Sequence, residues 1–306
     1  MKSKFFLFPL LAIALTVFST DPLSLLIQSL EKERNLQWMG QQVYTVITEK
    51  GPLHFKSIVK YNKMGKTRVE FVSPPNFAGY VMILEKDSGV IIGPKGRIIP
   101  FPRYLQPDSV ANVHIELISK SAKVSLIGEE KISGRSARIF LIKPAFVKGG
   151  YLKVWIDKTT GIRLKTERYS PDGKLLSSIS LVSLQLNPPL REKEFNLPIS
   201  PIQTQNYSLE ELEKILRFRP LLPSYIPRGY KILHIHPLIA PRQKAILIHL
   251  SDGINPITIM ESPSRGRYFK ALDEHDTVMI KVKKFLVILK GNVDRKVLEQ
   301  IGLSMR

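Results

Sequence analysis

The chain has 306 residues, 43% of them hydrophobic, which allows a substantial buried core and suggests two domains. It contains no cysteine, which excludes disulfides, thiol catalysis and the lipid-modified cysteine of a lipoprotein. Forty-six Lys and Arg against 26 Asp and Glu give a net charge of +20, which favours acidic partners such as anionic lipid. The alternative explanation of this charge is an ordinary solvated basic surface.

The first twenty residues have the layout of a secretory signal. Lys2 and Lys4 precede an apolar run from Phe5 to Phe18, and small residues follow. A run of about 14 residues is shorter than the roughly 20 that span a bilayer. We therefore expect residues 1–20 to be removed and the protein to be periplasmic, where it meets no nucleic acid. Val17 makes the cleavage site imperfect, so a retained anchor is the alternative.

The next part of the sequence predicts one helix followed by a sheet. Apolar residues at helical spacing predict a helix over Pro22–Leu36. From Val43 to Phe195, short β-branched and aromatic runs separated by turn signals predict eight to eleven antiparallel strands. Several runs alternate between polar and apolar residues, so each of these strands has one solvent-exposed face and one apolar face. The first helix and a second one at Ser109–Ser119 are expected to cover the dry face, giving a curved half-barrel over helices.

A second, smaller α+β domain is predicted after a linker rich in Pro, Ser, Gln and Asn. A capping box of Ser208 and Glu211 begins a helix over Leu209–Leu216. Five strand-like runs follow, and Asp294 caps a last helix over Arg295–Ile301. The expected organisation is a signal at 1–20, a binding domain at 21–198, a linker and helix at 199–218, and an α+β domain at 219–306.

The sequence shows little that could carry out catalysis. His234 and His236 lie on one side of a predicted strand and could bind a metal, but no third ligand lies nearby in sequence, so we interpret them as ordinary strand histidines. The carboxylate clusters are mixed with lysines or lie in turns, and no nucleophile elbow or phosphate-binding loop is present. We expect no enzyme activity, no cofactor and no metal. An exported enzyme whose site assembles only in space is an alternative.

Several segments together resemble the RseB/MucB family of periplasmic sigma-E regulators, whose first domain is similar to the lipoprotein carrier LolA. The sharpest part is the sequence from Trp155 through Asp157 to Gly161, in which Asp157 opens a turn and Gly161 supplies its backbone angles. In the second domain, the turn Ser251-Asp252-Gly253 is similar to the family's central turn. The chain departs from the family at Ala145–Gly150, where only Lys148 is charged.

The resemblance implies a regulator that binds the periplasmic part of a single-pass anti-sigma factor and senses lipid or envelope stress. A half-barrel with a dry concave face also suits an acyl chain, because each buried methylene contributes about 0.8 kcal/mol. The residues expected to line such a hydrophobic cavity are Phe55, Val59, Phe71, Met82, Leu84, Leu152, Val154, Ile156 and Leu164. For each of them, ordinary core packing is the alternative role. A lipid or lipoprotein carrier is the rival function, and the oligomeric state is left open.

Overall fold

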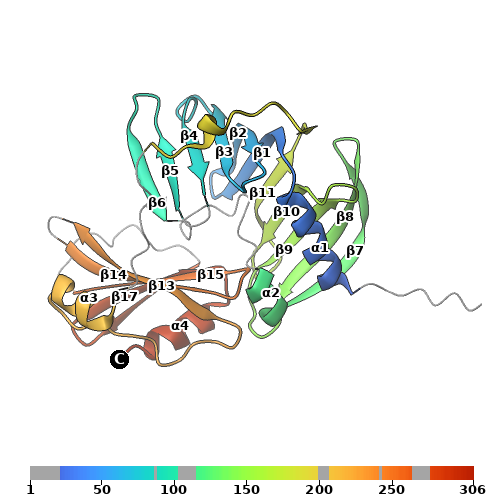
Figure 1. The fold of residues 1–306 in the computed structure, drawn as a ribbon. Helices are drawn as coiled ribbons and strands as arrows, with labels where there is room; N and C mark the ends of the chain where they lie inside the picture. The colour runs from blue at the N-terminus through green and yellow to red at the C-terminus, as the bar shows by residue number, and fades with distance from the viewer. Residues whose placement is uncertain (1–20, 86–87, 103–114, 199–206, 241–242, 264–275) are drawn as a thin grey trace, which may run out of the picture.

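The computed structural model describes residues 21–85, 88–102, 115–198, 207–240, 243–263 and 276–306, and it shows two antiparallel sheets with few helices (Figure 1). The expected signal, most of the expected linker and the first part of the helix predicted at Ser109–Ser119 lie outside these residues. Within the described part of the chain, no helix is both long and apolar enough to span a bilayer.

The N-terminal sheet has twelve strands and follows α1 (Pro22–Arg34). Its strand order is β6-β5-β4-β3-β2-β1-β11-β10-β9-β8-β7, and β12 pairs with β1. The strands are β1 (Trp38–Thr48), β2 (Gly51–Tyr61), β3 (Thr67–Ser73), β4 (Val81–Leu84), β5 (Ser88–Ile92), β6 (Ile98–Pro102), β7 (Ala122–Ile132), β8 (Arg135–Pro144), β9 (Tyr151–Asp157), β10 (Arg163–Tyr169), β11 (Leu175–Leu181) and β12 (Gln185–Leu186).

The two faces of this sheet differ in chemistry, as the alternation in the sequence predicts. Directly paired residues share a face. One row runs through Phe55, Tyr44, Ile179, Thr166, Val154 and Phe140, and we call this side the inner face. The neighbouring row on the other side, the outer face, runs through His54, Thr45, Ser178, Glu167, Lys153 and Leu141. The inner face is therefore the apolar one and must be covered.

Helices cover one half of the inner face. Leu26 and Leu30 of α1 and Ile118 of α2 (Ile115–Ser121) pack on Phe140 and Val154 in one hydrophobic cluster. A second cluster extends from β1–β4 to β8–β11. Its members on β1–β4 are Trp38, Val59, Tyr61, Val69, Met82 and Leu84. Two clusters thus bury the inner face, and the second also includes Leu164 and Leu181 of the middle strands β10 and β11.

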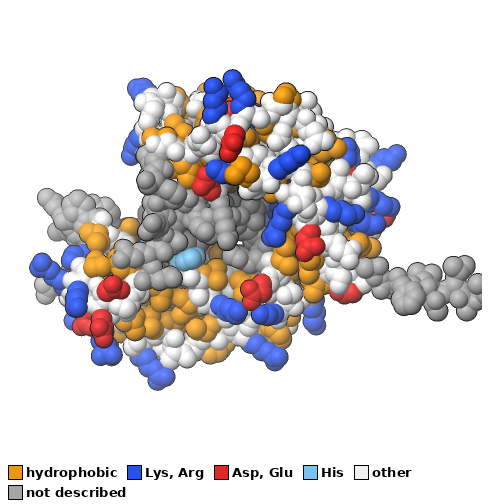
Figure 2. All heavy atoms as spheres, in the orientation of Figure 1, with side chains coloured by type: hydrophobic (Ala, Val, Ile, Leu, Met, Phe, Trp, Pro, Cys, Tyr) orange, Lys and Arg blue, Asp and Glu red, His pale blue; other side chains and the backbone are white. Residues whose placement is uncertain are grey.

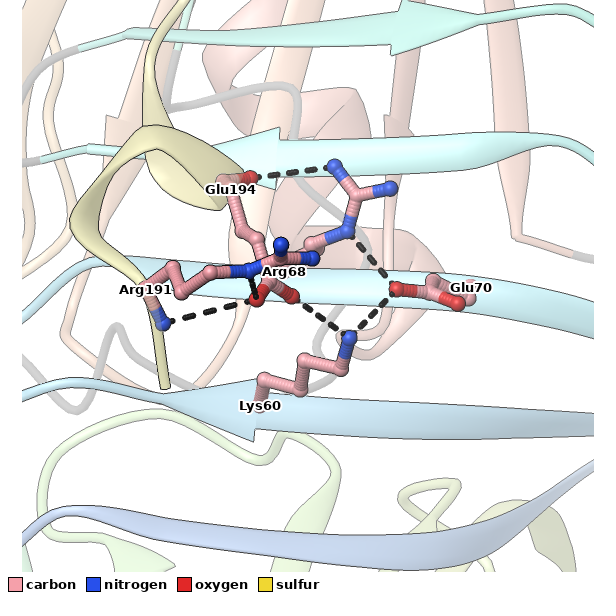
Figure 3. A network of polar contacts seen from close by, with 5 residues as sticks. All are labelled: Lys60, Arg68, Glu70, Arg191 and Glu194. Atoms are coloured by element: carbon pink, nitrogen blue, oxygen red, sulfur yellow. Dashed lines mark hydrogen bonds and ion pairs between the residues drawn. The ribbon is translucent and has the colours of Figure 1, made fainter. Parts of the chain in front are cut away.

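The short helix η2 (Glu192–Phe195) lies against the outer face of β2 and β3 (Figure 3). Lys60 bridges Glu194 at 2.7 Å and Glu70 at 3.0 Å, while Arg68 donates to the Glu194 carbonyl at 3.0 Å. Hydrogen bonding to Lys60 lowers the pKa of Glu194 to about 2. This network holds the segment that leaves the N-terminal sheet.

The C-terminal sheet has five strands in the order β13-β14-β15-β17-β16. They are β13 (Lys231–Ala240), β14 (Gln243–Ser251), β15 (Pro256–Pro263), β16 (Thr277–Val282) and β17 (Phe285–Gly291). Two helices, α3 (Leu209–Leu216) and α4 (Arg295–Leu303), pack on one of its faces through a core that includes Leu212, Leu216, Leu298 and Ile301. We call the opposite face, which carries His236 and His249, the open face.

The mainly β fold with a curved, helix-covered first sheet is confirmed. The helix at Leu209–Leu216 and its capping box are present as predicted, and Asp294 caps the last helix. The described part of the sheet has twelve strands where eight to eleven were expected, because β12 consists of only two residues and carries no pattern. The described helix α2 ends at Ser121, two residues beyond the expected end at Ser119.

Candidate binding site

An aromatic patch occupies a partly exposed area of the inner face. It consists of Tyr44, Phe55, Phe77 and Tyr80, whose successive ring centroids are 6.0, 5.2 and 6.2 Å apart. Tyr44 and Phe55 are cross-strand partners on β1 and β2, while Phe77 and Tyr80 come from the connection between β3 and β4. Phe77 is 40% exposed and the neighbouring Leu53 is 52% exposed. The patch therefore offers apolar surface that the described residues leave partly uncovered.

The C-terminal sheet lies across from this patch. In Figures 1 and 3 it is on the side of β2–β4 opposite to η2, which is the inner-face side. In Figure 2 the described side chains of the two sheets are separated by a region that we call the hollow, and a histidine side chain lies at its lower margin. Because α3 and α4 cover the other side of the C-terminal sheet, its open face is the one turned towards the hollow.

Histidines distinguish the open face of the C-terminal sheet. His236 and His249 stack with ring centroids 5.2 Å apart and planes 9° apart, and His234 pairs with His249 across the strands. Burial lowers the pKa of His236 to about 4 and that of His249 to about 3, and in each case a neighbouring histidine adds to the effect. These two imidazoles are therefore neutral at pH 7. No set of three or more metal-ligating side chains able to hold an ion occurs among the described residues.

A seam of backbone and amide contacts joins the two sheets beside the hollow. Asn255, which is fully buried, donates to the Gly150 carbonyl at 2.8 Å, and the Gly150 N–H donates to the Asn292 carbonyl at 2.8 Å. The Asn292 side chain donates to the Tyr169 carbonyl at 3.0 Å, and Arg168 donates to the Ile254 carbonyl at 2.9 Å. We call these contacts, with the turn described next, the seam.

The turn Ser251-Asp252-Gly253 of the C-terminal sheet packs against α2 of the N-terminal domain. The Asp252 carboxylate accepts the N–H groups of Ile254 at 2.8 Å and Asn255 at 2.6 Å, and burial raises its pKa. Ser121 donates to the Asp252 carbonyl, which ties the turn to α2. Gly253 has φ +90°, and an added Cβ would lie 2.9 Å from Leu117 Cβ. The turn that resembles the family's central turn is thus also one of the contacts between the two domains.

The hairpin turn at Asp157–Gly161, which resembles the family's sequence, has the geometry expected from its residues. One Asp157 carboxylate oxygen accepts the N–H groups of Thr159 at 3.1 Å and Thr160 at 2.7 Å, and Gly161 has φ +77°. Arg135 pairs with the same carboxylate at 2.8 Å, and these contacts hold the pKa of Asp157 below its usual range despite burial. Trp155 donates to Glu130 at 2.6 Å.

The nine residues expected to line a cavity occupy different positions in the structure. Seven are buried in the two clusters of the N-terminal sheet: Val59, Met82, Leu84 and Leu164 in one, and Leu152, Val154 and Ile156 in the other. Phe55 and Phe71 are only half-buried, and Phe55 belongs to the aromatic patch. A cavity formed by these residues stays a prediction, and Phe55 and Phe71 are the two whose surface is accessible.

Sequence reasoning missed Tyr44, Phe77, Tyr80, Asn255 and Asn292. An aromatic residue directly after the Ser73-Pro74-Pro75-Asn76 turn is a signal that could have identified Phe77, because turns rarely need aromatic residues. No pattern identifies the two asparagines, whose partners lie 105 and 123 residues away.

The fold and the seam define a class of protein with a helix-covered half-barrel joined to a small α+β sheet. Residues 86–199 match the family model of the MucB/RseB N-terminal domain. Pseudomonas aeruginosa MucB in its complex with MucA is similar to this chain with a TM-score of 0.61 and 16% identity, over 93% of this chain and 98% of that one. A crystal structure of MucB in complex with MucA(peri) gives a TM-score of 0.60 and 15% identity over 92% and 98%.

MucB without a partner is similar with a TM-score of 0.56 and 15% identity, over 92% of this chain and 97% of that one. No curated protein has a significantly similar sequence. The resemblance to the RseB/MucB family is confirmed: the chain carries a match to that family's N-terminal domain, and its fold is that of MucB over more than nine-tenths of its length.

Proposed function

We propose that this protein is a periplasmic regulator that binds the periplasmic segment of a single-pass anti-sigma factor in the hollow between its two sheets. The observation that carries the proposal is the shared fold with MucB, including MucB bound to MucA(peri), over almost the whole chain. In this proposal residues 1–20 direct export, residues 21–198 form the binding domain and residues 219–306 form the second domain. The role is binding, with no covalent step.

The aromatic patch supports this function chemically. The partly exposed aromatic side chains of the first sheet favour an extended or helical peptide with apolar anchors. The basic surface would attract an acidic segment before it reaches the hollow.

Binding is tested with the periplasmic segment of the anti-sigma factor encoded in the same genome, by isothermal titration calorimetry. We expect a complex that Phe77→Ser weakens at least tenfold, because Phe77 is exposed at the centre of the aromatic patch. Leu303→Ser is the matched control, since Leu303 is 76% exposed on α4, which lies away from the hollow. An equal loss of affinity in both variants would show that the segment does not bind in the hollow. If the wild-type protein does not bind the segment, the proposed function is refuted.

A lipid-binding function is the second candidate, and the half-buried Phe55 and Phe71 on the apolar inner face favour it. A fluorescent fatty acid is the probe. Saturable binding that the anti-sigma segment displaces would make lipid a signal for the regulator. Saturable binding without any anti-sigma complex would instead indicate a carrier.

A further inference from the structure

The C-terminal sheet buries a carboxyl group in its apolar core. Glu261 lies on β15 between its cross-strand partners, Ile246 of β14 and Val287 of β17, and it is fully buried. Both partners belong to the hydrophobic core that α3 and α4 cover. Because directly paired residues share a face, the Glu261 side chain points into the same core.

Glu261 has one hydrogen-bond donor among the described residues. Its Oε2 atom accepts the Leu221 N–H at 2.9 Å, whereas its Oε1 atom is buried and has no partner in the described part of the chain. A buried ionised carboxylate needs several donors or a cation, so these surroundings favour the neutral acid. In agreement, burial raises the pKa of Glu261 from 4.5 to about 7, and the Leu221 N–H opposes this only in part.

The charged groups of the elements packed around Glu261 point elsewhere. On β14, Lys244 donates to the Ile215 carbonyl at the end of α3, at 2.6 Å. On α3 and directly after it, the exposed charged residues are Glu210, Glu211, Glu213, Lys214, Arg217 and Arg219. On β16, β17, the turn between them and α4, they are Lys281, Lys283, Lys284, Lys290, Arg295 and Lys296. Glu299 pairs with Arg295 at 3.1 Å, and Arg306 is exposed.

The donor to Glu261 belongs to a segment that holds several parts of this domain together. Residues 217–224, which we call the connection, follow α3 and lead towards β13. Within it, Leu222 exchanges two backbone hydrogen bonds of 3.1 Å with Arg306, the last residue of the chain. Leu221 packs in the same core as Leu212 and Leu216 of α3. Glu261 therefore anchors the connection to the sheet from inside the core.

We propose that Glu261 makes the attachment of α3 and the connection to the C-terminal sheet depend on pH. The neutral acid keeps both in place. An ionised carboxylate regains hydration only if water reaches it, and the connection and α3 are what cover it. The attachment is tightest below pH 4.5, weakens as the pH rises from 4.5 to 7, and stays weak above pH 7. The device lies on the side of the C-terminal sheet away from the hollow and does not depend on the proposed partner.

Hydrogen exchange of the full chain, corrected for the intrinsic exchange rate at each pH, tests this coupling. We expect the opening constant of the connection to be at least tenfold larger at pH 8 than at pH 5. A carboxyl group with a pKa of about 7 when closed and 4.5 when open changes this constant by up to about 300-fold. Strand β9 in the same molecule is the internal reference. A connection whose opening does not change with pH, or changes only as much as that of β9, would overturn the proposal.

A variant that cannot ionise assigns the effect to Glu261. Glu261→Gln keeps the shape of the side chain and an acceptor for the Leu221 N–H, so its opening constant should no longer rise between pH 5 and pH 8. Glu213→Gln, at an exposed position on α3, is the matched control and should keep the wild-type dependence. If Glu261→Gln is folded by circular dichroism and still opens more at pH 8, another group is responsible. If it does not fold, the comparison of the connection with β9 in the wild type decides.

Discussion

At the scale of single residues, Gly161 joins the family-like hairpin to α1. Its φ of +77° is unfavourable for any side chain, and an added Cβ would collide with the carbonyl of Ser29 in α1. The glycine therefore serves two purposes, the turn and the close approach of the helix. Only the first of these could be predicted from the sequence.

We expect Gly161→Ala to lower the free energy of unfolding by about 2–4 kcal/mol, from backbone strain of about 1–2 kcal/mol plus displacement of α1. Gly173→Ala is the matched control, because Gly173 has φ +87° but its nearest neighbour, the Tyr151 hydroxyl, would lie at an ordinary 3.7 Å. This control should lose about 1–2 kcal/mol. Urea denaturation of both variants measures the difference, and equal losses would show that α1 does not press on this site.

At the scale of elements, η2 is held mainly by Glu194. A carboxyl whose pKa is lowered in the folded state stabilises the protein above its ordinary pKa of 4.5, and this contribution is lost as the pH falls towards 2. We expect Glu194→Gln to cost about 1 kcal/mol at pH 7, and its difference from the wild type to shrink below pH 4.5. Stability curves from pH 7 to pH 3 test this, with the exposed Glu192→Gln as control. A difference that is constant with pH would mean that the charge of Glu194 does not hold η2.

Most elements of this protein could be predicted because their signals are local. The capping box at Ser208, the alternation in β9 and the turn at Asp157 each act within a few residues, and all are present. The binding surface could not be predicted in the same way. The alternation shows that Val59 and Phe55 share a face, but the neighbours that bury one and leave the other half-exposed come from other strands.

The seam could not be predicted for the same reason, because its contacts join residues far apart in the sequence. The sequence indicates that Ala145–Gly150 differs from the family, and the structure places this segment against the C-terminal sheet, where Gly149 bridges to Val293. At Gly150, an added Cβ would collide with Asn292. The glycines at 149 and 150 fit that position because they lack side chains, but the requirement arises only from a partner about 140 residues away.

At the scale of the whole molecule, the seam should make the two sheets unfold as one unit. We expect Asn255→Ala to leave the Gly150 carbonyl without its donor and to weaken this coupling, since a buried unpaired polar group costs about 1–3 kcal/mol. Calorimetry should then show two transitions where the wild type shows one, with an increased radius of gyration in solution scattering. Asn196→Ala, at an exposed position after η2, is the control. A single transition in both variants would show that the seam is not the main link.

The protein carries a net charge of +20, whereas the aromatic patch is apolar and the two stacked imidazoles of the open face are uncharged. Long-range attraction governs how often a ligand arrives, and short-range contact governs how long it stays. Raising the salt concentration should therefore slow capture of an acidic segment while leaving the lifetime of the captured state almost unchanged.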